Sequence, residues 1–421
     1  MKKRSQSTLL SVGVLGLFVL IPSVLHADVS GDVVYSRHYN NHFDLYRNDG
    51  TDLTEQADNG QIAGMDDGIF GIVGTIDGNV VLGRTYNNAF DLLSYDGGTL
   101  AEVGRSGSTT GMDDGLFGMV AASDGTVVVA RTYDPASAAP LGFDLIRYDV
   151  SQNPIVDLNR SPQNLAGVDD GLFGMVATAD NHVVMARLFN NQFDLLRYDV
   201  AADPIAETNR SSLLAGVDSG LFGMVAAADG TVVVARTYDP AGPNAGASLG
   251  FDLMRFDVTA DPIVDLNRST QNVAGVDDGL LDMVALAGGD VVMIREYNGS
   301  WDLISYDIDP DPNNPMANIV KRADNNGARG LDDGYLGAVA MGNGDIVLAR
   351  NSGGAIELFS YDGVTLAENG NNMGSSRGID DGFIGLVGFP AQEIPEPASL
   401  LLLVSGLITV LFSASRAQVR D

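Results

Sequence analysis

A five-residue pattern, Gly-apolar-Asp-Asp/Ser-Gly, recurs seven times along the chain and constrains its fold more than any other feature. Its copies begin at Gly64, Gly111, Gly167, Gly216, Gly275, Gly330 and Gly378. The intervals between them run from 47 to 59 residues. Repeats of this length are typical of the blades of a β-propeller and are longer than the units of most solenoids.

The same succession of segments follows each of the first six copies. An apolar run such as 116–122 leads through a turn, usually of the Asp-Gly or Asn-Gly type, into a strand such as 127–131. A variable loop then precedes a third strand such as 143–149. Asp-Gly between two β-branched runs is a strong hairpin signal. A weaker fourth strand, such as 155–158, completes a predicted four-stranded unit.

The two ends of the repeat region complement each other. The first segments, 32–37 and 43–45, correspond to second and third strands, whereas 383–389 corresponds to a first strand without a successor. We therefore expect the last strand to join the first ones and to leave no long sheet edge exposed. The predicted fold is all-β: a closed seven-bladed β-propeller of four-stranded blades over residues 28–390. A β-solenoid or two separate β domains is the alternative.

The N-terminal segment has the features of a secretory signal. Basic residues at the start (Lys2, Lys3 and Arg4) precede an apolar run over 9–21, and Ala27 is a small residue at the expected cleavage point. The sequence thus predicts a signal peptide over 1–27 and an exported protein. Because the chain has no cysteine, the exported domain depends on its hydrophobic core rather than on disulfides.

The C-terminal segment predicts a membrane anchor. After a linker over 391–397 come apolar residues at 398–414, which as a helix would span roughly 25 Å, at the short end for a bilayer. Arginines within the last segment, 415–421, favour a cytoplasmic C-terminus. We expect a transmembrane helix at 398–414, with the propeller in the periplasm and the inner membrane as a partner before processing.

The order of a Pro-Glu-Pro motif, an apolar segment and a basic end resembles the PEP-CTERM sorting signal. In that family an exosortase of Gram-negative bacteria recognises the motif and the tail is removed. The resemblance implies an exosortase-type partner, a destination at the cell surface or in the extracellular matrix, and a link to exopolysaccharide or biofilm. It assigns the sorting role to Pro395, Glu396, Pro397 and Arg416. A permanent membrane anchor is the alternative.

Three polar positions recur in register, and antiparallel pairing would bring them to one rim of the propeller. An Arg ends each second strand: Arg37, Arg84, Arg131, Arg187, Arg236, Arg295 and Arg350. An acid opens each third strand: Asp44, Asp91, Asp144, Asp194, Asp252, Asp302 and Glu357. Further carboxylates precede the first strands: Asp66, Asp67, Asp113, Asp114, Asp169, Asp170, Asp218, Asp277, Asp278, Asp332, Asp333, Asp380 and Asp381.

These residues have an architectural interpretation and a functional one. One Arg per blade can bridge the flanking carboxylates, and short Asp side chains can accept hydrogen bonds from turn amides. The alternative is that the Asp-Asp-Gly carboxylates bind Ca²⁺, which prefers oxygen ligands. The segment 307–313 also has alternating oxygens, but Pro312 stands where a calcium loop needs glycine. Calcium is therefore the one cofactor that the sequence suggests.

The third strands of some blades carry an Arg-Tyr segment, as in Arg147-Tyr148 and Arg197-Tyr198. With the apolar strand after Asp-Gly, this segment is similar to bacterial propeller repeats of the delta-sixty kind. That resemblance implies no particular activity.

The composition and the motifs favour a binding protein over an enzyme. A net charge of −31 makes nucleic acid an improbable partner. Only His38, His42 and His182 remain after removal of the signal peptide, and no catalytic constellation is apparent. We predict a non-enzymatic surface or matrix protein that binds an envelope or extracellular glycan or protein.

The alternative function is that of a secreted polysaccharide-active hydrolase or lyase on the same scaffold. A cluster of unlike residues in one blade would favour this enzyme. The visible departures from the sevenfold pattern, which are Ser219, Asp282 and Glu357, are too mild to make that case.

Overall fold

The computed structural model describes residues 31–39, 42–50, 52–60, 68–86, 89–110, 116–133, 142–162, 171–189, 192–215, 221–238, 250–269, 279–297, 299–311, 318–325, 329–330, 334–373, 377–378 and 382–389. These residues form strands and turns, and none of them belongs to a helix long and apolar enough to cross a membrane. The predicted signal peptide, the Pro395-Glu396-Pro397 motif, the segment 398–414 and Arg416 lie outside them.

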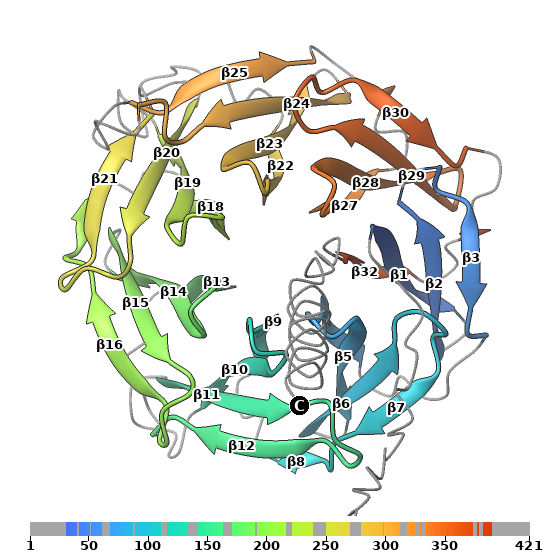
Figure 1. Ribbon diagram of the computed structural model, residues 1–421, viewed down its shortest axis with the longest axis horizontal. Helices are drawn as coiled ribbons and strands as arrows, with labels where there is room; N and C mark the ends of the chain where they lie inside the picture. Colours follow the sequence, from blue (N-terminus) through green and yellow to red (C-terminus); the bar gives the residue numbers. More distant parts are fainter. Residues whose placement is uncertain are drawn as a thin grey trace, which may run out of the picture.

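The described strands form seven antiparallel sheets arranged as blades around a central channel (Figure 1). From the channel outward, blade 1 comprises β4 (Gly68–Gly74), β5 (Asn79–Tyr86), β6 (Ala89–Asp96) and β7 (Glu102–Arg105). Blade 2 comprises β9 (Leu116–Ala121), β10 (Val127–Tyr133), β11 (Gly142–Asp149) and β12 (Val156–Arg160). Blade 3 comprises β13 (Gly171–Ala177), β14 (His182–Phe189), β15 (Gln192–Asp199) and β16 (Ala206–Arg210).

The next three blades repeat this order. Blade 4 comprises β18 (Leu221–Ala226), β19 (Val232–Tyr238), β20 (Gly250–Asp257) and β21 (Val264–Arg268). Blade 5 comprises β22 (Gly279–Ala285), β23 (Asp290–Tyr297), β24 (Ser300–Asp307) and β25 (Val320–Asp324). Blade 6 comprises β27 (Gly334–Ala340), β28 (Asp345–Ser352), β29 (Ala355–Asp362) and β30 (Glu368–Asn371).

Blade 7 closes the ring with strands from both ends of the repeat region. Its innermost strand is β32 (Gly382–Gly388), followed by β1 (Asp32–Tyr39), β2 (His42–Asp49) and β3 (Glu55–Asp58). β32 pairs antiparallel with β1, and the Phe389 amide donates a 3.1 Å hydrogen bond to the Asp32 carbonyl. The predicted closure and the seven four-stranded blades are confirmed, and the solenoid and two-domain alternatives are wrong.

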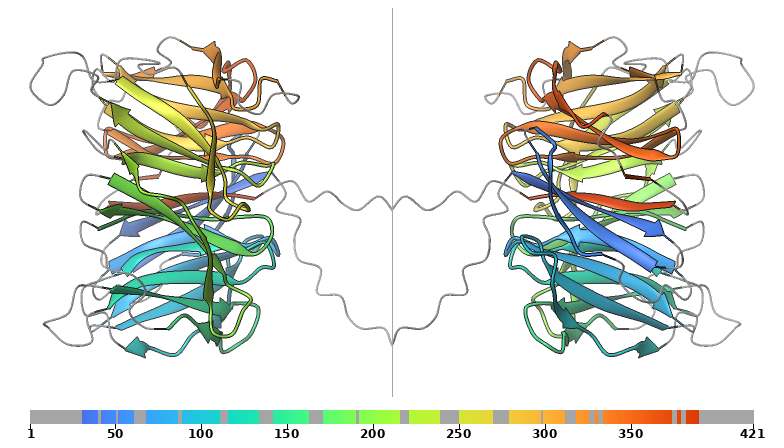
Figure 2. Two further views of the ribbon diagram at one scale, coloured as in Figure 1. Left: turned by 90° about the vertical axis from the view of Figure 1, so that its left-hand side faces the viewer. Right: turned by 90° about the vertical axis from the view of Figure 1, so that its right-hand side faces the viewer.

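The blades stack face to face, which explains why the middle strands are apolar without alternation (Figure 2). All eight residues of β6 are buried, whereas the outermost strand β12 buries only Asn159 of its five. Each interface carries its own hydrophobic cluster between two blades, such as the one joining blades 1 and 2. Edge-to-face aromatic pairs add to it, since Phe90 of blade 1 packs on Tyr148 of blade 2 with ring centroids 6.2 Å apart.

Within the described residues, four blades carry a short additional strand that the sequence pattern does not predict. These strands pair with the third strand of their blade: β8 (Thr109–Thr110), β17 (Leu214–Ala215), β26 (Arg329–Gly330) and β31 (Arg377–Gly378). Two residues are too few to show a periodicity of hydrophobic side chains, so only the folded arrangement reveals them.

The propeller has two faces, which differ in the strand ends that they present. We use the name loop face for the face of the propeller at which the second strands end, as at Arg84, and the third strands begin, as at Asp91. We call hairpin face the opposite end, where first and second strands join in turns such as Asp124-Gly125, in which Gly125 has a φ of +83°. Both the first and the last described residues, Gly31 and Phe389, belong to the hairpin face, because the Gly31 amide bonds to the Phe389 carbonyl.

Candidate functional site

The antiparallel registers bring the predicted rim positions together on the loop face. In blade 1 Arg84 lies opposite Asp91 on the third strand and opposite Ile69 near the start of the first strand. The same register holds Arg131 opposite Asp144 and Leu116 in blade 2. The predicted meeting of these strand ends at one rim therefore occurs in the structure.

In every blade the Arg donates to the acid that faces it. Two nitrogens, Nε and Nη2, reach the carboxylate at distances of 3.1 and 2.9 Å for Arg37–Asp44, 2.9 and 2.6 Å for Arg84–Asp91, 2.7 and 2.9 Å for Arg131–Asp144, 3.0 and 2.6 Å for Arg187–Asp194, 2.8 and 3.0 Å for Arg236–Asp252, 3.0 and 2.5 Å for Arg295–Asp302, and 2.9 and 2.7 Å for Arg350–Glu357. All fourteen side chains belong to buried residues. Such two-point charge-assisted bonds fix the second strand against the third.

The Asp-Asp-Gly carboxylates lie outside the described residues, so calcium binding by them remains a prediction. Among the described residues no group of three or more His, Asp or Glu side chains is arranged to hold a metal ion. The acids of segment 307–311 are engaged in other contacts: Asp307 Oδ1 accepts the Asp309 amide at 3.0 Å, and Asp307 Oδ2 accepts Arg322 Nη2 at 2.6 Å. Asp307 thus holds an acidic turn together, and calcium binding by the segment 307–313 remains untested because its residues 312 and 313 lie outside the described ones.

The hairpin face carries a second set of ion pairs that the sequence analysis missed. Arg147 and Arg255, from third strands, donate to Asp124 and Asp229 in the hairpin turns of their own blades. Arg322 of blade 5 reaches Asp290 at 3.0 Å. For Arg147 the signal was the Arg-Tyr segment of the third strand, but its Arg meets the turn between the first and second strands only in the folded blade.

Hydrogen bonds around these turns lower the pKa of their carboxyl groups. Burial alone would raise the pKa of Asp124, but hydrogen bonds from Thr126 and the charge of Arg147 outweigh it. The pKa of Asp229 is lowered in the same way by Thr231 and Arg255. These acids are therefore ionised at neutral pH and bound to their own blade.

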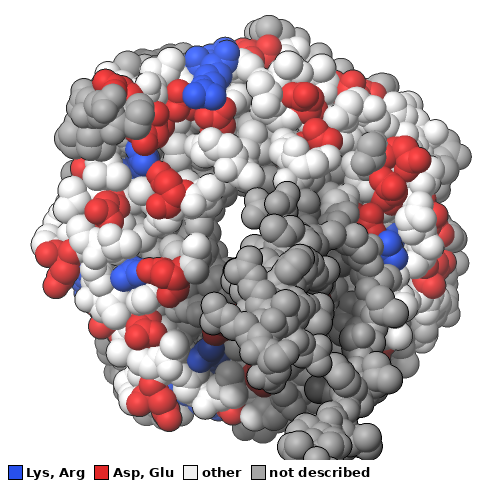
Figure 3. Space-filling model, in the orientation of Figure 1, with Lys and Arg blue, Asp and Glu red and all other residues white. Residues whose placement is uncertain are grey.

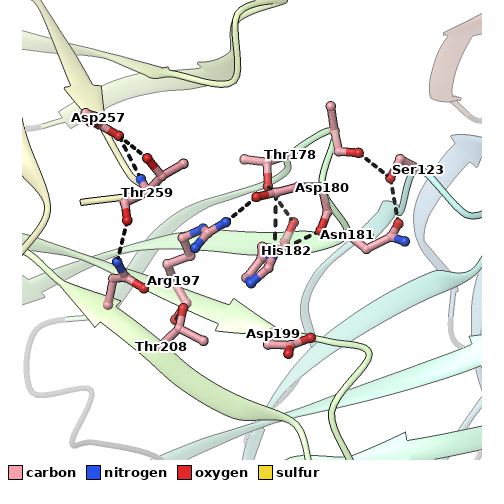
Figure 4. Close-up of polar contacts among 12 residues, drawn as sticks. Ser123, Thr178, Asp180, Asn181, His182, Arg197, Asp199, Thr208, Asp257 and Thr259 are labelled. Atoms are coloured by element: carbon pink, nitrogen blue, oxygen red, sulfur yellow. Dashed lines mark hydrogen bonds and ion pairs between the residues drawn. The ribbon is translucent and has the colours of Figure 1, made fainter. Parts of the chain in front are cut away.

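In blade 3 the corresponding turn has a different composition (Figure 4). Asp180 accepts hydrogen bonds from Arg197 and, at 2.6 Å, from the Thr178 hydroxyl. His182 Nδ1 lies 2.9 Å from the Asp180 carbonyl, and Ser123 Oγ of blade 2 lies 2.6 Å from Asn181 Oδ1. The polar groups of this cluster join neighbouring turns and blades.

Outer strands are tied to the next blade by asparagine side chains. Asn209 Nδ2 of blade 3 donates to the Ala260 carbonyl of blade 4 at 2.7 Å, and Asn267 Nδ2 of blade 4 donates to the Ile308 carbonyl of blade 5 at 2.9 Å. Parallel backbone contacts accompany them, such as the 3.0 Å bond from the Ile319 amide to the Arg268 carbonyl. These recurring polar residues therefore have an architectural role.

A cavity of about 470 Å³ opens where the innermost strands end on the hairpin face. The side chains in its wall are apolar and include Met175, Met224, Met283, Val225 and Leu386, and polar backbone groups of the strands lie between them. Figure 3 shows this face, with acidic side chains at many places on the part of the ring that is not drawn in grey. The cavity thus presents apolar side chains and strand backbone on a face that also carries acidic side chains.

Two of the predicted departures from sevenfold symmetry lie at one interface. Asp282 on β22 contacts blade 6, where its carboxylate accepts a 3.1 Å hydrogen bond from the Tyr335 hydroxyl. Glu357 of blade 6 binds Arg350, whose guanidinium lies 5.7 Å from the Trp301 ring centroid of blade 5. The unlike residues therefore gather between blades 5 and 6, while Ser219 lies outside the described residues.

The strand arrangement is similar to that of several solved structures. The periplasmic gluconolactonase of Pseudomonas aeruginosa is 12% identical, with a TM-score of 0.55 over 84% of this chain and 99% of that one. A protein of Bacteroides fragilis, described as a candidate 6-phosphogluconolactonase, is 11% identical, with a TM-score of 0.53 over 85% and 98%. A protein of Lactobacillus plantarum gives the same identity, TM-score and coverage.

At these identities the likeness shows a shared propeller fold and nothing of the site. No protein-family model matches the chain, and no curated protein matches it either.

Proposed function

We propose that this chain is an exported binding or structural protein whose propeller holds a partner at the cell surface or in the extracellular matrix. The observation that supports this function best is the cavity with apolar side chains on the hairpin face. A concave surface where apolar side chains lie beside a few polar backbone groups suits recognition. The acidic side chains on the same face favour an envelope protein with apolar and basic side chains over a neutral glycan.

A pair of variants tests binding at this cavity. Ala226 lines the cavity, and Ala226→Glu would place a carboxylate among its apolar side chains. Ala101→Glu, at an exposed position of blade 1, is the matched control. Purified chain is mixed with exopolysaccharide and, separately, with solubilised envelope proteins of the producing bacterium. Retention of an envelope protein that is lost in Ala226→Glu and kept in Ala101→Glu supports the proposal, whereas equal retention by both variants contradicts it.

The export route rests on the resemblance of the C-terminal segment to a PEP-CTERM signal. We expect the wild-type chain to lose its tail and leave the inner membrane in a host that has an exosortase. Replacing Pro395, Glu396 and Pro397 with alanine should keep the full-length chain in the inner-membrane fraction. Identical masses and fractions for both chains would show that this motif does not direct processing.

The second candidate is a polysaccharide-active hydrolase or lyase. The observation that favours it is that two unlike residues, Asp282 and Glu357, take part in contacts involving the same two blades, 5 and 6. The fold itself is shared with proteins named as lactonases. Incubation with the exopolysaccharide, followed by analysis for new reducing ends or unsaturated uronates, separates the two functions. Released oligosaccharides would replace the binding proposal with the enzymatic one.

A further inference from the structure

The innermost strand of blade 5 breaks a pattern that the other six blades keep. They have glycine at one position, and blade 5 has Asp282: the glycines are Gly71, Gly118, Gly174, Gly223, Gly337 and Gly385. This position faces the next blade, because a Cβ on Gly174 or Gly223 would lie 2.9 or 3.7 Å from a methionine of the neighbour. Asp282 therefore puts a carboxyl group into a contact that is apolar between the other blades.

Blade 6 carries two matching changes. Ala338 stands where other blades have a larger apolar residue: Ile72, Met119, Met175, Met224, Met283 and Leu386. Tyr335 stands where other blades have an apolar side chain: Ile69, Leu116, Leu172, Leu221, Leu280 and Phe383. The short alanine leaves room for the carboxyl group, and the tyrosine supplies a hydroxyl to meet it.

Both protonation states of Asp282 find hydrogen-bond partners. As a carboxylate, its Oδ1 accepts the Met283 amide at 2.8 Å, and its Oδ2 accepts the Tyr335 hydroxyl at 3.1 Å and the Ala338 amide at 3.2 Å. As a neutral acid, it can donate to the Tyr335 oxygen instead, because the hydroxyl hydrogen rotates. Only the ionised form brings a charge into the interface.

The strands packed against Asp282 provide little to offset that charge. β18 has no ionisable residue, and Tyr335 is the only one on β27. The nearest rim arginines, Arg295 of blade 5 and Arg350 of blade 6, bind Asp302 and Glu357. Burial raises the pKa of Asp282 although three hydrogen bonds act to lower it. Burial and Asp282 together raise the pKa of Tyr335 well above 10.0, so this tyrosine stays neutral.

We propose that packing at the interface between blades 5 and 6 depends on pH: the blades pack tightly while Asp282 is neutral, and their packing loosens when this carboxyl group ionises. An ionised group in apolar surroundings without a counterion destabilises the structure that holds it. The folded chain holds the proton of Asp282 more tightly than the unfolded chain does. The neutral carboxyl group therefore adds to the stability of the fold at low pH. This contribution is lost as the pH rises through the raised pKa of Asp282.

The chain contains a natural reporter of this interface. Trp301 is its only tryptophan and is fully buried. It packs in the cluster between blades 5 and 6 with Ile294, which lies opposite Asp282, and with Tyr335. Its indole Nε1 donates to the Tyr361 hydroxyl of blade 6 at 3.3 Å. Looser packing between these blades would therefore expose the indole to water and shift its emission to longer wavelength.

The test follows Trp301 emission in the full chain from about pH 4 to about pH 8, a range that extends upward from the ordinary pKa of an aspartate carboxyl group. Circular dichroism at each pH shows that the chain remains folded. We expect the emission maximum to move to longer wavelength with rising pH in a single titration. Asp282→Asn, which cannot ionise, should abolish this titration. Asp77→Asn, at an exposed turn of blade 1, should leave it unchanged.

A second variant guards against misfolding of Asp282→Asn. The double variant Asp282→Gly with Ala338→Met recreates the glycine and methionine contact of four other interfaces, so it should fold and show no titration of Trp301 emission. Emission that is constant with pH in the wild-type chain would overturn the proposal. So would a titration that persists in the double variant.

Discussion

Arg131 donates two hydrogen bonds to the carboxylate of Asp144, at 2.7 and 2.9 Å, across the second and third strands of blade 2. The two residues are 2% and 1% exposed. Moving both charges out of water is unfavourable, and their mutual attraction offsets this cost only while both are present. Removal of Arg131 would leave the buried carboxylate of Asp144 without this ion pair.

Removing one partner of this pair should therefore destabilise the chain far more than removing both. We expect Arg131→Met to lower the free energy of unfolding by about 3–5 kcal/mol, and Arg131→Met with Asp144→Leu to recover much of that loss. Urea unfolding of the two single variants and the double variant measures the coupling.

The exposed pair Arg105 and Glu102 is the control for this experiment. Its side chains are 43% and 38% exposed, and its removal should cost about 1 kcal/mol or less. If the loss of unfolding free energy in the Arg131 and Asp144 double variant equals the sum of the two single losses, the buried pair is not coupled.

Replacing a glycine of the innermost strands with alanine should lower stability more where a neighbouring side chain lies closer to the new Cβ. A Cβ on Gly174 would lie 2.9 Å from Met224 Cγ, whereas one on Gly118 would meet its nearest atom at 4.0 Å. We expect Gly174→Ala to lower stability by about 1–3 kcal/mol through overpacking. Gly118→Ala should change it by about 0.5 kcal/mol or less. Equal melting temperatures for the two variants would contradict this account of the packing between blades.

Features that repeat within one blade could be predicted from the sequence. The Arg131 and Asp144 pair follows from strand order, and the closure follows from the strand types at the two ends. Contacts between blades could not be predicted, because they join residues that no local pattern connects. The bond from Asn209 to the Ala260 carbonyl and the contact of Asp282 with Tyr335 each join residues more than 50 positions apart.

For the Asp-Asp-Gly carboxylates, too, the position could be predicted from the sequence and the contacts could not. Their position before each first strand follows from the repeat, but their contacts depend on loops outside the described residues. The hairpin-face ion pairs could be predicted only in part. Both partners, such as Arg147 and Asp124, recur visibly, yet each belongs to a different strand of a four-stranded sheet, and only the folded blade shows that they meet.

Ion pairs on the hairpin face should contribute to stability at neutral pH and not in acid. The lowered pKa of Asp124 means that its contribution is complete above the ordinary value of 3.8 and is lost as the pH falls through the lowered value. Asp124→Asn should therefore unfold at a lower temperature than wild type at pH 7, by about 1 kcal/mol or less in stability. Thermal melts of both chains should converge in acid. A constant difference at every pH would exclude ionisation of Asp124 as its cause.

Calcium should raise the melting temperature if the Asp-Asp-Gly carboxylates bind it. A ligand at about 100 times its dissociation constant stabilises by about 2.7 kcal/mol, which is a few degrees for a large domain. The measurement compares melts in EDTA and in millimolar Ca²⁺ at fixed ionic strength, with Mg²⁺ as the control for general charge screening. Mg²⁺ prefers to keep its own water ligands, so a rise with Ca²⁺ alone indicates a dedicated oxygen site. The same melting temperature in all three solutions would leave these turns with the architectural role of hydrogen-bonding their own backbone.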